Sequence, residues 1–296
     1  MSSVVPQPIT AAMRPEEITA RSGSSFTTAF VCLDRARREG MTAIYAFCRA
    51  ADDAVDEADD AATGRAHLQF WRAELAAVAN GKGATPVGQA LQTAMQRFGV
   101  EVRPLLDLLD GVETDLAPHA FADETELRCY CYRVASAVGL ACLPVLGAVG
   151  AEATRFADAL GKALQFTNIL RDLRFDAELG RCYVPQTWLA ETGVERAWLD
   201  GAGPSAVYAP GGPVAALCGR LAQKAAGEFA AARAALRLLP RQQRRALVPA
   251  RIMGAIYGDL LRRLVQRGGD LRGPRMRVPR MKKAWLALLV FVGVHA

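Results

Sequence analysis

The sequence predicts an all-α protein that folds as one large helical domain. Hydrophobic residues make up 51% of its 296 residues, which is enough to bury a substantial core. They recur at the three- and four-residue spacing of amphipathic helices along nearly the whole chain, and no sustained alternation of β-branched residues indicates a strand. No unit of fixed length repeats, which excludes a solenoid.

The breaks between the predicted helices carry glycine or proline. A glycine turn at 81–83 precedes the third helix, Pro118 follows the fourth, and glycines at 147 and 150 separate the fifth from the sixth. Residues 200–212 form the longest loop, but helices of similar composition flank it, so it does not mark a domain boundary. We expect one domain over residues 21–287, between a flexible N-terminal tail (1–20) and an apolar C-terminal tail (288–296). The predicted helices span residues 34–60, 65–79, 86–98, 102–116, 125–149, 151–177, 213–238 and 242–267.

The cysteines indicate a reducing compartment. They number seven, lie mostly within apolar helical runs and lack the paired spacing of a zinc site, so we expect reduced, buried thiols in a cytoplasmic protein. The first 14 residues contain no apolar run of the secretory kind. No run of about 18 apolar residues predicts a helix that spans a membrane.

The C-terminal region separates charge from hydrophobicity. Residues 241–283 carry 13 Lys and Arg against Asp259 and Asp270, and an apolar run over 284–294 follows. Such a run is too short to span a bilayer but suits its inner surface, beside anionic headgroups. A terminal helix that packs on the core, with solvated arginines nearby, is the alternative. No nucleic-acid partner is expected, because the arginines lack a reading motif and interleaved aromatic residues.

Two pairs of aspartates are spaced four residues apart within apolar helical segments. Asp52 and Asp56 continue the stripe of Met41, Tyr45 and Cys48, because steps of three and four residues return to one face of a helix. Carboxylates on an inward face are costly unless a cation compensates them. One such pair alone would be read as solvated surface acids, and a second pair favours a site.

Asp172 and Asp176 form the second pair and give the stronger signal. Their stripe carries only small and amide residues, which leave room and supply oxygen ligands. Oxygen ligands favour Mg²⁺ or Mn²⁺ over zinc, and Mg²⁺ typically combines one or two carboxylates with phosphate oxygens. With Arg49 and Arg171 beside the two pairs, the pattern predicts a metal cage that binds a diphosphate. The other members of the second stripe are Ala157, Gly161, Gln165 and Asn168.

These motifs resemble those of the squalene and phytoene synthases, head-to-head prenyl transferases with the all-helical isoprenoid synthase fold. The resemblance extends from about residue 22 to residue 287, and within the family it points to the bacterial presqualene diphosphate synthases of hopanoid pathways. It implies a single helical bundle with a central cavity. The matching segments are 22–26, 45–57, 107–116, 130–139, 167–172 and 180–185.

The resemblance also implies roles for individual residues. Asp52 and Asp56, with Asp53 beside them, match the first metal-binding motif, and Asp172 and Asp176 match the second. The positions that hold diphosphate or support the metal site are matched by Ser25, Arg49, Gln165, Asn168, Arg171, Tyr257 and Arg275. The positions that line the cavity are matched by Phe26, Tyr45, Tyr130, Ala135, Val138 and Gly139.

The chain departs from the family pattern at three places. Phe175 stands where a glutamate usually precedes the last aspartate of the second motif. Ala120 and Phe121 replace an expected Arg-Tyr pair, and Thr27 and Thr28 replace aromatic residues. None of these changes removes a principal metal ligand, but they bear on the product that is formed.

The implied reaction condenses two molecules of farnesyl diphosphate to presqualene diphosphate, with Mg²⁺ or Mn²⁺ and with release of diphosphate. The proton lost on ring closure goes to the released diphosphate or to a tyrosine such as Tyr130, and the sequence leaves both open. NADPH is not expected, although a squalene synthase would use it. Phytoene or dehydrosqualene synthase is the alternative activity, and a non-catalytic lipid-binding protein is the alternative of another class. The sequence does not determine the oligomeric state.

Overall fold

The structure is a computed structural model that describes residues 7–21, 29–117 and 119–293. Within these ranges it is helical and contains no strand, as the sequence predicts. The α-helices are α1 (Pro15–Arg21), α3 (Arg35–Asp56), α4 (Ala61–Ala79), α5 (Pro86–Phe98), α6 (Arg103–Val112), α7 (Glu124–Cys131), α8 (Ala137–Leu146), α9 (Ala151–Glu178), α10 (Gln186–Thr192), α11 (Pro213–Leu238), α12 (Arg241–Ala246), α13 (Val248–Arg267) and α14 (Arg280–Phe291). The short turns are η1 (Ile9–Ala12), η2 (Phe30–Cys32), η3 (Glu113–Leu116), η4 (Tyr132–Ser136), η5 (Arg196–Asp200) and η6 (Ser205–Tyr208).

Side-chain caps fix where the first long helices begin. The Asp34 carboxylate accepts the backbone N–H of Arg37 at 2.9 Å and starts α3, and that of Asp60 accepts the N–H of Thr63 at 2.7 Å and starts α4. Each cap satisfies an amide that has no partner within the helix. The helix predicted over 34–60 is shorter in the structure and ends at Asp56. Asp59 and Asp60 lie in the turn between α3 and α4.

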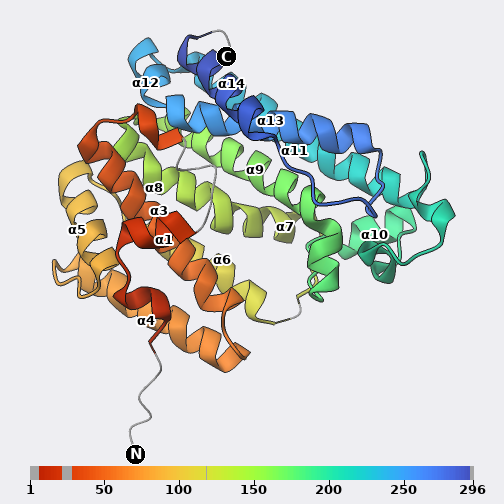
Figure 1. Ribbon diagram of the computed structural model, residues 1–296, viewed down its shortest axis with the longest axis horizontal. Helices are drawn as coiled ribbons and strands as arrows, with labels where there is room; N and C mark the ends of the chain where they lie inside the picture. Colours follow the sequence, from red (N-terminus) through yellow and green to blue (C-terminus); the bar gives the residue numbers. More distant parts are fainter. Residues whose placement is uncertain (1–6, 22–28, 118, 294–296) are drawn as a thin grey trace, which may run out of the picture.

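The central helix of the bundle is α9 (Figure 1). It packs along α11 on one side and against α8 and η4 on another, and α13 also contacts it. α3 packs on α8 and also contacts α4, α5 and α6, and α6 in turn packs against η4 and α8. This arrangement encloses a central cavity bounded by α3, η4 with α8, α9 and the first turns of α13.

The helix predicted over 125–149 is divided by the π turn η4. Opposite this turn α9 carries Gly161, whose Cα lies so close that an added Cβ would stand 2.5 Å from the Cα of Ser136. The Ser136 hydroxyl donates to the carbonyl of Asp158 at 2.7 Å and ties the two helices together. π turns are rare and often occur at functional sites. Here the turn brings Val134 and Ala135 to the cavity wall.

The sequence predicts no helix long and apolar enough to span a membrane, and the composite segment Glu124–Leu146 differs from that expectation. By length and composition alone it is long and apolar enough to cross one. A single such segment carries little weight, because a core helix meets the same criterion. In this fold the segment packs against α6 and α9 and lines the cavity.

The expected N-terminal tail is wrong for residues 9–20. These residues belong to η1 and α1, and α1 packs on α3. Ile18 is buried in the core cluster, which explains why this segment packs as a helix although it has no long apolar run. The predicted boundary at residue 21 therefore falls at the end of a packed helix.

Two differences affect the C-terminal third. The helix predicted over 242–267 is split into α12 and α13, because Pro249 fits only in the first turn of a helix. The boundary expected between 287 and 288 falls inside α14, where Leu286 and Val290 are both buried. Between α10 and α11, the Tyr208 hydroxyl donates to the carbonyl of Trp198 at 2.6 Å, so that the longest predicted loop is held in place.

We expect Gly161→Ala to lower the free energy of unfolding by about 1–3 kcal/mol, because the new methyl group would overlap the π turn. Gly227→Ala is the matched control, because Gly227 lies at an exposed position of α11 where an added Cβ meets nothing within 4 Å. This change should stabilise the protein by about 0.5–1 kcal/mol. Urea unfolding followed by circular dichroism measures both. Equal stability of the two variants would contradict the close contact between α9 and η4.

Candidate active site

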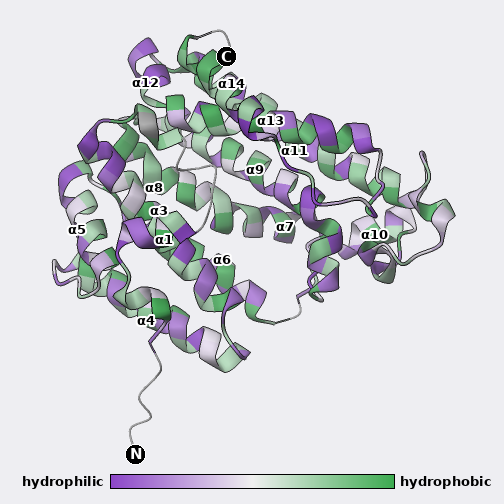
Figure 2. Ribbon diagram, in the orientation of Figure 1, coloured by the Kyte–Doolittle hydropathy of each residue, from purple (hydrophilic) through white to green (hydrophobic). Residues whose placement is uncertain are grey.

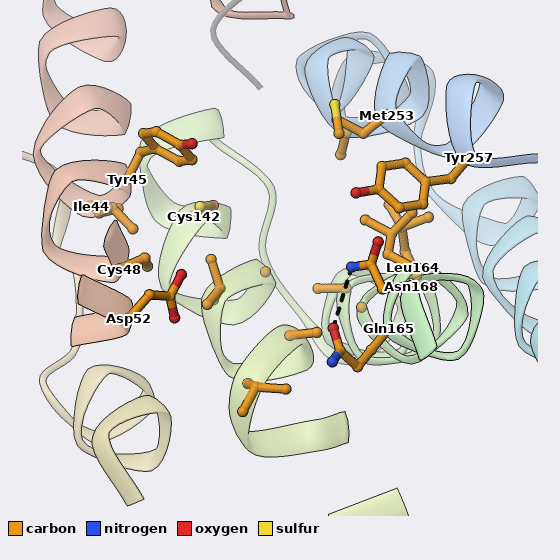
Figure 3. Close-up of a pocket in the computed structure, with 18 of the residues that line it drawn as sticks. Ile44, Tyr45, Cys48, Asp52, Cys142, Leu164, Gln165, Asn168, Met253 and Tyr257 are labelled. Atoms are coloured by element: carbon orange, nitrogen blue, oxygen red, sulfur yellow. Dashed lines mark hydrogen bonds between the residues drawn. The ribbon is translucent and has the colours of Figure 1, made fainter. Parts of the chain in front are cut away.

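The central cavity has a volume of about 510 Å³, within the range of pockets that bind drug-sized ligands. Its walls are mostly apolar, with carboxylates, amides and arginines gathered toward the C-terminal ends of α3 and α9. Figure 3 shows Tyr45, Cys48 and Asp52 on α3 facing Gln165 and Asn168 on α9 across the cavity. The apolar part is lined by residues that include Phe30, Met41, Ile44, Val138, Leu143, Phe156, Leu160 and Met253.

The predicted stripe on α3 is confirmed. All of its members, Met41, Tyr45, Cys48, Asp52 and Asp56, line the cavity. Their spacing of three and four residues keeps them on one face of α3, and the two aspartates extend that face by a further turn. The short steps in sequence are therefore sufficient to bring apolar and acidic residues into one wall.

Asp53 does not join this wall. It lies one residue further round the helix and lines a separate cavity of about 120 Å³ between α3 and the N-terminal segment. Its carboxylate accepts a hydrogen bond from Arg49, and the same guanidinium lies 3.5 Å from the carboxylate of Asp52. The structure thus gives Asp53 a role in holding Arg49 rather than the place at the metal site that the sequence predicts.

The predicted stripe on α9 is also confirmed. Its six members, Ala157, Gly161, Gln165, Asn168, Asp172 and Asp176, all line the cavity. The Asn168 amide donates to Gln165 Oε1 at 3.4 Å (Figure 3), while its own Oδ1 is buried without a hydrogen-bond partner. A buried oxygen without a partner is costly, so this atom is suited to a ligand or cation in the cavity.

Asp172 is held by two guanidinium groups. Arg275 donates from Nε and an Nη to the two carboxylate oxygens at 2.6 and 2.7 Å, and Arg171 donates from Nε at 2.9 Å. Burial acts to raise the pKa of Asp172, but the bonds from Arg171 and Arg275 outweigh burial and lower the pKa below its usual value. The Arg171 guanidinium also interacts with Tyr257 on α13. Arg171, Arg275 and Tyr257, three of the predicted residues, therefore lie around Asp172.

The other inward aspartates are less well compensated. Burial raises the pKa of Asp52 to about 7, and the neighbouring Asp56, Asp53 and Asp115 add to the effect. Burial likewise raises the pKa of Asp176 to about 7, with contributions from other carboxylates around it. The Asp52 side chain is 41% exposed, and it lines the cavity. The protein thus concentrates negative charge where a cationic ligand could relieve it.

Asp115 on η3 lies between the two aspartate pairs and is missing from the predicted site. It accepts hydrogen bonds from the hydroxyls of Tyr130 at 3.0 Å and Tyr183 at 2.8 Å. Burial raises the pKa of Asp115 and also raises the pKa of Tyr130 well above its usual value, so the phenol stays protonated. The resemblance covers segments 107–116 and 180–185, but a lone acid at a helix end gives no periodic signal.

Arg181 is the second residue that the sequence does not single out. It donates to Asp56 at 2.9 Å and so connects the loop after α9 to the end of α3. Its charge also acts to lower the pKa of Asp176 and of Asp115. Arg181 therefore offsets part of the negative charge at the acidic end of the cavity, although it is not among the residues that line the cavity.

Two of the residues that differ from the family pattern, Phe175 and Phe121, make specific packing contacts near the site. The ring of Phe175 lies 5.9 Å from the guanidinium carbon of Arg275 and 4.6 Å from that of Arg174, which are cation–π contacts. Phe121 is buried, and its ring centroid lies 5.3 Å from that of Tyr130. Phe175 thus supports the arginine that pairs with Asp172. The predicted residues Ser25 and Phe26, and Thr27 and Thr28, lie outside the described residues.

The metal cage predicted from the two aspartate pairs is not complete. Within residues 7–21, 29–117 and 119–293, no three His, Cys, Asp or Glu side chains are close enough to hold a metal ion. The pairs stand on opposite walls, and both carboxylate oxygens of Asp172 already accept hydrogen bonds from Arg171 and Arg275. The donor set still fits a hard cation, because it offers carboxylates and the unpartnered oxygen of Asn168.

Comparisons with known proteins identify the family of this chain. The squalene/phytoene synthase family model matches residues 19–282. The chain is 36% identical to the presqualene diphosphate synthase of Rhodopseudomonas palustris over 270 residues, 90% of this chain and 92% of that protein. It is also 36% identical to the presqualene diphosphate synthase of Zymomonas mobilis over 281 residues, which cover 92% of this chain and 90% of that protein. A solved dehydrosqualene synthase in complex with ligand matches 95% of both chains with a TM-score of 0.80 and 27% identity. The chain belongs to the squalene/phytoene synthase family.

Proposed function

We propose that this protein joins two molecules of farnesyl diphosphate head to head to form presqualene diphosphate. The observation that carries the proposal is a mostly apolar cavity with opposed aspartate pairs and arginines gathered toward one end. It is supported by 36% identity to presqualene diphosphate synthases over most of the chain. A prenyl diphosphate has the same division into a long apolar chain and a polyanionic head.

The arginines would bind the diphosphate groups. Arg171 and Arg275 neutralise Asp172 in the structure, and their planar guanidinium groups match phosphate oxygens equally well. Arg49 and Arg181 stand at the ends of the acidic cluster, and the Tyr257 hydroxyl adds a donor. Transfer of these donors from carboxylate to phosphate would leave the aspartates free to bind cations.

Asp52, Asp56, Asp172 and Asp176, with the oxygen of Asn168, would hold Mg²⁺ or Mn²⁺ together with diphosphate oxygens. Such ions supply positive charge that stabilises a departing diphosphate. The incomplete protein ligand set agrees with this proposal, because Mg²⁺ commonly takes part of its shell from substrate phosphate. We therefore expect binding of metal and of substrate to depend on each other.

The apolar walls would protect the reactive intermediate. When the carbon–oxygen bond of the donor breaks, an allylic cation forms, and water would quench it. Side chains such as Phe156, Leu160 and Met253 line the part of the cavity in which the prenyl chains would lie. The double bond of the acceptor then attacks the cation, and loss of a proton closes the cyclopropane ring.

The released diphosphate is the proton acceptor that the structure supports best. Tyr130 lines the cavity, but its raised pKa keeps the phenol protonated and its hydroxyl donates to Asp115, so the base form that would accept a proton is not available. Tyr130 and Tyr183 would instead fix Asp115 by donating to both of its oxygens. The tyrosines thereby position the acidic end of the cavity without taking the proton.

Incubation of the purified protein with labelled farnesyl diphosphate and Mg²⁺ tests the proposed reaction directly. We expect presqualene diphosphate to accumulate, both with and without NADPH. Squalene formed only with NADPH would identify a squalene synthase instead, and dehydrosqualene formed without it would identify that alternative. Recovery of a longer product from geranylgeranyl diphosphate alone would overturn the proposal in favour of phytoene synthesis.

Asp172→Asn should lower turnover at least about 100-fold, because stabilisation of the departing diphosphate is worth several kcal/mol. Asp59→Asn, an exposed acid beyond the end of α3, is the matched control and should keep wild-type turnover. Steady-state release of diphosphate measures both, and circular dichroism confirms that both fold. A fully active Asp172→Asn variant would show that Asp172 does not stabilise the departing diphosphate. Wild-type protein without turnover would favour the alternative of a non-catalytic lipid-binding protein.

In the absence of metal and substrate, the negative charge of Asp52 should lower the free energy of unfolding. The pKa of Asp52 is raised to about 7, so its ionisation destabilises the folded state as the pH rises from about 4 to about 7. In metal-free buffer, Asp52→Asn should raise the melting temperature relative to wild type by an amount that grows across this range and is constant above it. Calorimetry at a series of pH values measures the difference, with Asp59→Asn as the control. A difference independent of pH would show that Asp52 is not an uncompensated acid.

A further inference from the structure

Helix α14 exposes an apolar stripe on the outside of the bundle. Met281, Trp285, Leu288 and Val292 follow one another at helical spacing on one face, and they are between 51% and 87% exposed. The other face of the helix packs on α13 and buries Leu286 and Val290. Phe291, which is also exposed, widens the stripe. One face of α14 therefore packs on the core, as the alternative prediction for the C-terminal run has it, and the other face is exposed in the part of the chain that the structure describes. Membrane contact through this exposed face stays a prediction.

This stripe is bordered by positive charge and contains no acid. Residues 273–293 include no Asp or Glu, and Arg280 and Lys282 flank the stripe by helical spacing. Within the described ranges Arg277, Arg280 and Lys282 form no ion pair with a carboxylate, unlike most arginines of the molecule. In Figure 2 the last turns of α14 are mainly hydrophobic, while the neighbouring α12 is mainly hydrophilic.

The surface continues onto α12. Val290 of α14 and Arg251 of α13 line the same small cavity, and Arg251 donates to the carbonyl of Arg244 in α12, so the end of α14 lies near α12 (Figure 1). Arg241 and Arg245 of α12 are exposed. Large apolar side chains also border α12. Leu238 is exposed just before this helix, and the exposed Val149 donates its N–H to Gln243 within it.

We propose that this surface, made by α14 and α12, binds to an anionic lipid bilayer. A stripe of Trp, Leu, Phe and Met flanked by Lys and Arg matches the boundary between acyl chains and negative headgroups. The helix has 12 residues and is about 18 Å long, too short to span a bilayer, so it would lie in the plane of the membrane. Charge argues for lipid over a second copy of this chain, because two such surfaces would repel each other.

The surface adjoins the substrate cavity. Leu247, Pro249 and Ala250, at the junction of α12 and α13, line that cavity. The segment that leads into α14 carries Arg275, which pairs with Asp172. Binding to a bilayer would therefore bring the apolar part of the cavity close to a source of prenyl chains. This consequence depends on the proposed function, whereas binding to lipid does not.

Sedimentation with vesicles tests the proposal in the absence of substrate. At low ionic strength the full chain should bind vesicles of equimolar phosphatidylcholine and phosphatidylglycerol, and only weakly those of phosphatidylcholine alone. Neutralising Arg280→Gln or Lys282→Gln should each lower the partition coefficient about fivefold. The triple change Trp285→Ser, Leu288→Ser and Phe291→Ser should lower it by about tenfold or more. Wild-type protein that does not bind anionic vesicles would overturn the proposal.

Matched controls separate this surface from general stickiness. Arg65→Gln with Lys82→Gln removes two exposed charges elsewhere, and Leu179→Ser removes an exposed apolar residue elsewhere; both variants should bind like wild type. Equal losses in the controls and the α14 variants would contradict the assignment. A form that self-associates through α14 without vesicles would show that a second copy is the partner.

Fluorescence gives an independent readout of contact. Trp285 is exposed, while Trp71 and Trp188 are buried. Its emission should shift to the blue on anionic vesicles and be quenched by brominated acyl chains. Trp285→Phe should remove the change in emission while leaving most of the binding intact. An unchanged emission from wild-type protein that does sediment with vesicles would place contact elsewhere and overturn the role of α14.

Discussion

The constraint that organises this molecule is the gathering of like charges at one end of a mostly apolar cavity. Asp52, Asp56, Asp115, Asp172 and Asp176 approach from α3, η3 and α9. Arginines lower the pKa of Asp172 below its usual value, whereas burial raises the pKa of Asp52, Asp115 and Asp176. Burial raises the pKa of Asp52 and of Asp176 to about 7, so the protein's own cations do not fully compensate these two carboxylates. The rest of the fold holds these groups apart on rigid walls, and a ligand that carries both metal ions and phosphate would complete the set.

Arg275 connects this site to the far end of the chain. It comes from the extended segment between α13 and α14, crosses to Asp172 on α9 and stacks against Phe175. The same segment continues into the helix whose exposed stripe we assign to a bilayer. A contact at the membrane surface and a contact at the diphosphate site thus lie on one short stretch of chain. The contact with Arg275 gives a physical reason for Phe175. Its aromatic ring helps to position the Arg275 guanidinium, whereas the glutamate that is usual at this position would compete with Asp172 for it.

The helices and the two acidic stripes follow from local rules. Turns at glycine and proline, caps such as Asp34 and spacing of three or four residues are properties of short segments, and they locate Asp52, Asp56, Asp172 and Asp176 on inward faces. Where local rules compete, prediction fails. The N-terminal residues contain no long apolar run, but they fold into η1 and α1 because Ile18 is buried in the core. The π turn in the helix predicted over 125–149 exists because Gly161 lets α9 approach it.

The sequence by itself determined the helical class, the carboxylate and amide stripes and the family resemblance, because each depends on residues near one another in the chain. Only the tertiary structure decided how the walls face each other. It set Asp115 between the stripes with Tyr130 and Tyr183, turned Asp53 away toward the N-terminal segment, and brought Arg181 to Asp56 across 125 positions and Arg275 to Asp172 across 103. Such contacts depend on helix packing over long sequence separations, and no local period encodes them.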